Sequence, residues 1–164
     1  MLPVVILDTG KIKSVESYST YGVEAAMING PFSLFGEYIR SDISRDGNES
    51  LAFDGWYLGG SWLLTGESRN YRSRKGAFGG VEPGNSYGAW ELAARVSELN
   101  LNDGGVDGGR ERNFTLGLNW YPNPRVRLMA NYIMVDNDEE ADADGDAGGD
   151  DDPGIFQARV QTTF

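Results

Sequence analysis

Residues 113–135 read NFTLGLNWYPNPRVRLMANYIMV, and this stretch decides the fold class of the chain. Before the YPNP motif at residues 121–124, large apolar residues take every second position, with polar or small residues between them. The same alternation resumes from Val126 to Met134. A period of two is that of a β-strand with one apolar face, and proline and asparagine favour a tight turn. The stretch therefore predicts two antiparallel strands of about ten residues joined by a turn.

Alternation of this kind recurs along most of the chain and predicts an all-β fold. It is cleanest at the end, where residues 155–164 read IFQARVQTTF. A shorter apolar segment, LPVVIL at residues 2–7, is compatible with the stump of one more strand. We expect about seven or eight strands that follow one another as an antiparallel meander. The seven clearer strands cover residues 20–29, 31–40, 53–64, 88–98, 113–121, 125–135 and 155–164.

The connectors between these strands are predicted to alternate in length. Tight turns are expected at residues 29–31 and 121–124, and longer loops at residues 8–19, 41–52, 99–112 and 136–154. Short turns on one side and long loops on the other are typical of outer-membrane barrels. Residues 65–87 are the exception, because this long segment falls on the short-turn side.

The sequence gives little support for catalysis by side chains. The chain contains no cysteine and no histidine, which excludes Ser-His and Cys-His nucleophile systems and most zinc sites. We therefore expect no enzyme, no cofactor and no metal site. The acidic run DNDEEADADGDAGGDDD at residues 136–152 also departs from a calcium-binding EF-hand loop, and it is interpreted as a solvated loop.

The net charge of -11 is concentrated in that same acidic run. Outside it, basic and acidic residues nearly balance, so the charge argues only against nucleic acid as a partner. A loop of this charge could also lie against divalent cations bound to lipopolysaccharide, which is a hypothesis.

Two kinds of barrel remain compatible with the alternation. A soluble barrel points its apolar residues inward, whereas a membrane barrel points them at lipid. Strands of about ten residues match the length that crosses a bilayer at a tilt. The polar positions carry a mixture of Arg, Glu, Asn, Gln and Thr, as a wet lumen requires. Aromatic residues near the ends of apolar faces favour the membrane barrel further, and these are Trp90, Trp120, Tyr121, Tyr132 and Phe164.

Several motifs, in order, give the chain a resemblance to the phosphate-selective porin O and P family. The matching stretches are LDTG at 7–10, GPFSLFGEY at 30–38, SWLLTGES at 61–68, GAWELAARVSELNL at 88–101, NFTLGLNWYPNPRVRLMANY at 113–132 and the ending DDPGIFQARVQTTF.

The resemblance implies a passive channel in the outer membrane of a Gram-negative bacterium, selective for phosphate or polyphosphate and requiring no reaction. It further implies a homotrimer of 16-stranded barrels, in which this chain supplies roughly the C-terminal half of each barrel. An export signal and the family's first strands are not found, so we expect residues 1–164 to be the C-terminal portion of a single porin domain. The alternatives left open are a truncated fragment that does not conduct, and a small barrel that binds a ligand or is structural.

The resemblance also implies a path of arginines and lysines for anions along the lumen. One set of candidates is assigned to polar-face positions or strand ends: Arg95, Arg127, Arg159, Arg40 and Arg125. Pairing with Glu37 and Glu91, which would stiffen the wall, is the alternative. A second set lies in the long connector, where it could gather anions at a pore mouth or form a solvated turn or a subunit contact: Arg69, Arg72, Arg74 and Lys75. Lys11 and Lys13 are weaker candidates in the first loop.

Overall fold

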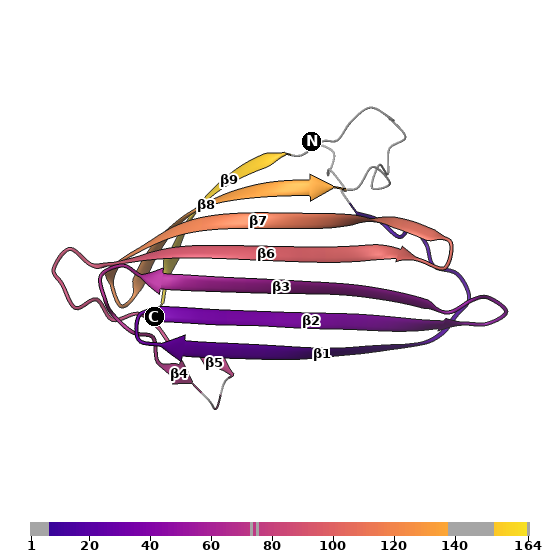
Figure 1. Cartoon of the computed structure of the whole chain (residues 1–164), viewed down its shortest axis with the longest axis horizontal. Coiled ribbons are helices and arrows are strands. Elements are labelled where there is room, and N and C mark those ends of the chain that lie inside the picture. Colours follow the sequence, from indigo (N-terminus) through magenta and orange to yellow (C-terminus); the bar gives the residue numbers. More distant parts are fainter. Residues whose placement is uncertain (1–6, 73, 75, 138–152, 164) are drawn as a thin grey trace.

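The fold is a single antiparallel sheet with a small hairpin beside it (Figure 1). The computed structural model describes residues 7–72, 74, 76–137 and 153–163. Within these residues no helix has the length and apolar character needed to cross a membrane. Seven strands lie in the order β1-β2-β3-β6-β7-β8-β9, and β4 pairs with β5 separately. The strands are β1 (Val15–Asn29), β2 (Phe32–Arg45), β3 (Leu51–Leu63), β4 (Tyr71–Arg72), β5 (Ala77–Phe78), β6 (Ala89–Asp103), β7 (Val106–Asn123), β8 (Val126–Asn137) and β9 (Gly154–Thr162).

The all-β meander is confirmed, with each of the seven predicted strands present. Every consecutive pair in the sheet is antiparallel. The β4–β5 hairpin was not predicted. The proposed stump at residues 2–7 falls outside the described residues except for Leu7, which belongs to no strand. Within the described chain β1 and β9 each pair with one neighbour, so the sheet is open.

Three of the predicted long loops are wrong in extent, because the strands continue into them. The loop expected at residues 8–19 ends before β1 begins at Val15. The loop expected at residues 99–112 reduces to a turn at Gly104 and Gly105, with Asp103 paired to Val106. Both glycines have positive φ, at 52° and 78°, which a two-residue hairpin turn requires and glycine adopts without strain. The loop expected at residues 41–52 likewise shortens to residues 46–50. Most of the acidic run lies outside the described residues.

The short turns and the long connector lie at the same end of the sheet, as predicted. Gly30 and Pro31 join β1 to β2, and Pro124 and Arg125 join β7 to β8. Residues 64–88, called the connector from here on, join β3 to β6 at that end and contain β4 and β5 (Figure 1).

One face of the sheet, the apolar face, is covered by no second layer of the described chain. A row across its middle pairs Leu34, Gly60, Ala94, Leu116 and Tyr132 on successive strands. Leu34, Leu116 and Tyr132 remain 45%, 42% and 46% exposed. Because exposed apolar surface of this extent is rare on soluble monomers, the face must contact another apolar medium or partner.

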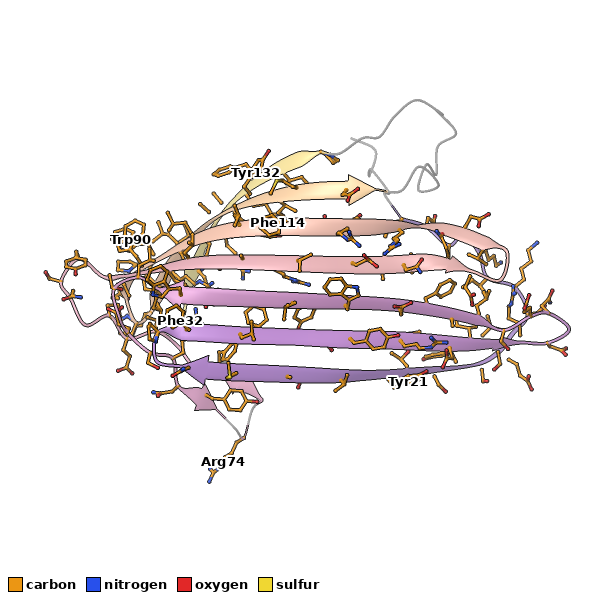
Figure 2. The ribbon with its side chains drawn as sticks, in the orientation of Figure 1. Tyr21, Phe32, Arg74, Trp90, Phe114 and Tyr132 are labelled. Carbon is orange, nitrogen blue, oxygen red and sulfur yellow. The ribbon has the colours of Figure 1, made fainter. Side chains whose placement is uncertain are left out.

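Aromatic pairs mark the short-turn end of the apolar face. Trp90 stacks on Trp120 with ring centroids 5.7 Å apart, and Phe32 stacks on Trp62 at 5.6 Å. Figure 2 shows Trp90 and Phe32 near that end. Such a position fits an aromatic girdle. Two residues were assigned to the girdle wrongly. Tyr121 is 6% exposed and packs in the core under the connector. Tyr132 lies in the row across the middle of the apolar face.

The opposite face, the polar face, is partly covered by the connector. Leu63, Val81, Ala89 and Tyr121 form the buried cluster where the connector meets the sheet. A T-shaped contact between Phe78 of β5 and Phe35 of β2, 5.8 Å between centroids, and the main-chain hydrogen bond from Gly79 to Asn70 fix the hairpin. The connector thus folds back over the polar face instead of projecting from the sheet.

Candidate functional site

The polar face carries three of the predicted arginines, on β6, β8 and β9. Arg95 on β6 pairs with Thr115 on β7, and Arg159 on β9 pairs with Met129 on β8. Arg127 on β8 pairs with Gln161 on the same face. Because paired residues of an antiparallel ladder share a face, these arginines lie on one face of the sheet, and that this face lines a lumen stays a prediction.

Arg95 lies in a polar setting that leaves its charge available. Its guanidinium carbon is 4.3 Å from the centre of the Tyr57 ring, a cation–π contact. Glu37 on β2 is the residue that pairs with Tyr57 in the ladder. No carboxylate of the described residues lies within 4.0 Å of the Arg95 guanidinium nitrogens. The same holds for Arg159, whose strand is exposed along its whole length.

The central feature of the polar face is the Glu91 cluster, formed by Arg69, Glu91, Asn119, Tyr121 and Arg127. The Nη2 atom of Arg69 donates to both carboxylate oxygens of Glu91, at 2.6 and 2.7 Å. Tyr121 donates its hydroxyl at 2.7 Å and Asn119 its amide at 2.9 Å. Arg127 lies 3.9 Å away. Glu91 is only 1% exposed, so this network compensates a buried charge.

The Glu91 cluster also fastens the connector to the sheet. Arg69 belongs to the connector, whereas its partners Glu91 and Tyr121 belong to β6 and β7. The far end of the connector is held separately by Trp120, whose indole N–H donates to the Tyr87 carbonyl at 2.9 Å. Breaking a buried ion pair by removing one partner costs about 3–5 kcal/mol, so the attachment is strong.

The two basic connector residues whose side chains the structure describes, Arg69 and Arg74, do not lie together. Arg69 is neutralised within the Glu91 cluster, whereas Arg74 is exposed at the tip of the hairpin (Figure 2). Arg72 belongs to β4, and Lys75 lies outside the described residues. Among the described side chains of the predicted cluster, the exposed one is that of Arg74.

The assignment of Arg40 to the polar face was wrong. Arg40 follows Tyr38 by two residues and pairs with Tyr21 and Asp54, so its side chain belongs to the apolar face near the loop end. Its Nε donates to Asp42 at 2.9 Å, and the Tyr21 hydroxyl donates to the same carboxylate at 2.7 Å. This salt bridge with Asp42 compensates the positive charge of Arg40.

The remaining candidates lie at the two ends of the sheet. Arg125 forms the β7–β8 turn, where its N–H donates to the Asn123 side chain at 2.9 Å and its carbonyl accepts from Thr163. Lys11 and Lys13 precede β1 and are exposed. None of the three lies in the Glu91 cluster.

Sequence reasoning missed a second charged group, at the loop end of the apolar face. Glu98 of β6 accepts hydrogen bonds from Arg110 at 2.7 Å and from Arg112 at 2.6 Å. Since residues 99–112 were expected to form a loop, their alternation was not followed. The pairing of Glu98 with Arg112 in the ladder shows that the strand period extends this far.

Glu67 holds the first turn of the connector. Its carboxylate accepts hydrogen bonds from the Thr65 hydroxyl and from the Gly84 N–H, the latter at 3.1 Å. Burial alone would raise the pKa of Glu67, but these hydrogen bonds dominate and hold the pKa below its usual value. The two ends of the connector are thereby joined through an ionised carboxylate.

Acidification is expected to loosen this junction. Since the pKa of Glu67 is lowered on folding, its stabilising contribution is complete above the unfolded value of about 4.3 and is lost as the pH falls below it. Cleavage of the connector by an acid protease should accelerate over that window. In Glu67→Gln the acceleration should be absent, and an unchanged pH dependence in this variant would show that another group controls the connector.

The fold and its two faces define the class of protein. A meander of long antiparallel strands, apolar on one face and bearing cations on the other, with an aromatic belt at one end, is the wall of a membrane β-barrel. The sequence matches the family described as phosphate-selective porin O and P over residues 2–164, and the chain belongs to this family.

Two relatives set the extent of the match. The chain is 31% identical to Porin O of Pseudomonas aeruginosa over 163 residues, which covers 92% of this chain and 36% of that protein. It is 32% identical over 127 residues to a Caulobacter vibrioides protein called "Uncharacterized protein", covering 74% of this chain and 25% of the relative. The chain thus spans about a third or less of the relatives it matches.

Proposed function

We propose that this chain is the C-terminal part of an outer-membrane porin that conducts anions passively. The polar face lines the lumen, the apolar face contacts lipid, and the connector lies at the periplasmic mouth. The transported ion is phosphate or polyphosphate, the name of the family being the support for this choice. Transport of this kind needs no reaction and no cofactor, so the porin is not an enzyme.

One observation carries the proposal: the polar face bears Arg95 and Arg159 without a salt-bridge partner in the described chain, while the apolar face is uncovered. Free cations on a wet wall attract anions and replace part of their hydration shell. Exposed apolar side chains on the other face match the hydrocarbon of a bilayer.

The open sheet supports the view that these strands are part of a larger barrel. β1 and β9 each have an edge without a partner in the described residues, and membrane strands require every backbone group to be paired. The remaining strands of a roughly 16-stranded barrel would close both edges. We propose further that the complete porin is a homotrimer in the outer membrane of a Gram-negative bacterium.

The decisive test is single-channel recording of the complete porin in a planar bilayer, in chloride with and without phosphate. We expect chloride conductance that phosphate inhibits. Arg95→Gln should reduce anion selectivity, measured as a smaller reversal potential in a chloride gradient, because it removes a lumen charge. Arg40→Gln removes the same charge from the apolar face and should leave the reversal potential unchanged. Cation selectivity, or equal effects of the two variants, would contradict the proposal.

A further inference from the structure

The Glu91 cluster has the composition of an oxyanion-binding site. Guanidinium groups of Arg69 and Arg127, the Asn119 amide and the Tyr121 hydroxyl all converge on one pair of oxygens. These donors are the ones that bind phosphate in proteins, and a carboxylate presents the same kind of acceptor oxygen. The position that an anion would occupy is therefore taken by a side chain of the protein itself.

Positive charge and donors exceed what Glu91 uses. Two arginines face one carboxylate, so the Glu91 cluster keeps a net positive charge. The Nε atoms of Arg69 and Arg127 are buried and have no hydrogen-bond partner among the described residues. The carboxylate of Glu67 in the connector is bound to Thr65 and Gly84 instead. Without the charge of Glu91, the same donors would have the capacity to hold an oxyanion from solution.

We propose that Glu91 is a specificity-determining residue that acts as an internal competitor of the permeating anion. Its carboxylate occupies the place between Arg69 and Arg127. Part of the positive charge of these arginines is therefore already offset by Glu91 when phosphate passes the connector. The inference rests on the proposed function of the porin. A channel conducts only when its ligand binds weakly enough to leave, and two partly buried arginines without a carboxylate would retain phosphate.

Glu91→Gln tests this role, because it keeps the size and hydrogen-bonding capacity of the side chain and removes its charge. In recordings of the complete porin, the concentration of inorganic phosphate that halves the chloride current should fall about tenfold or more, as expected for freeing charge-assisted hydrogen bonds. Adding Arg127→Gln to Glu91→Gln should restore the wild-type value. Calorimetric titration of the detergent-solubilised Glu91→Gln porin with phosphate should show a tighter site than wild type.

The control is Glu24→Gln, which removes the same charge from the polar face at a position that pairs with Glu37. It should leave phosphate inhibition unchanged. If Glu91→Gln does not assemble, Glu91→Asp retains the charge but withdraws the oxygens from Arg127, and it should strengthen inhibition in the same direction. Unchanged inhibition in a folded Glu91 variant would overturn the inference, whereas a wild-type porin that phosphate does not inhibit would overturn the proposed function instead.

Discussion

Ala94→Arg will lower the free energy of unfolding of the complete porin by about 2–4 kcal/mol, the cost of an arginine at the bilayer midplane on the lipid side of a barrel. Ala94 lies in the middle row of the apolar face, between Gly60 and Leu116. It is four residues from Trp90 of the aromatic belt and four from Glu98 of the charged group, about 14 Å along the strand in either direction at ~3.4 Å per residue. An arginine there is as far from either interface as β6 allows.

Ala93→Arg is the matched control, because it makes the same change one residue away on the other face. Ala93 pairs with Ser61 and Gly117, two small residues that leave room for a long side chain toward the lumen. We expect a loss below about 1 kcal/mol there, since a lumen-facing charge stays hydrated. Reversible unfolding in urea from phospholipid vesicles, followed by tryptophan fluorescence, measures both. Equal losses would mean that the apolar face is not the lipid face.

The faces of the sheet could be predicted from the sequence because strand period alone determines them. Alternation from Phe114 to Trp120 continues without interruption, and the structure keeps those residues on one face. The lengths of the strands were harder to predict. Beyond residue 99 the alternation is carried by charged residues such as Arg110 and Arg112 instead of apolar ones, so a strand that leaves the apolar zone was interpreted as a loop.

The Glu91 cluster was predicted only in part, as an alternative in which glutamates pair with arginines. That alternative holds for Arg127, whereas Arg95 is free of carboxylates among the described residues. The pairing of Arg69 with Glu91 was not predicted. Arg69 precedes Glu91 by 22 residues, so their meeting depends on how the connector folds back, which no periodicity encodes. Buried Leu63 and Val81 direct that fold, and neither stands out in the sequence.

Gly88→Ala will destabilise the complete porin by about 3 kcal/mol. The backbone conformation at this position disfavours a side chain, and neighbouring atoms leave no space for one. Gly88 has a φ of 83°. A Cβ atom there would lie 2.4 Å from the Tyr121 carbonyl oxygen and 2.8 Å from the Trp120 indole nitrogen. Relief of this overlap must displace Trp120 from its hydrogen bond to Tyr87, which holds the returning end of the connector.

Substitutions at two other connector glycines distinguish the cost of backbone strain from the cost of steric overlap. Gly66 has a φ of 91° but open space around it, so Gly66→Ala should cost only the backbone strain of about 1–2 kcal/mol. Gly80 has neither constraint, and Gly80→Ala should be neutral or slightly stabilising. Urea unfolding of the three variants should rank them in this order, with increased current noise in Gly88→Ala as the loosened connector moves at the pore mouth. If Gly88→Ala cost no more than Gly66→Ala, the contact with β7 would not be what holds the connector in place.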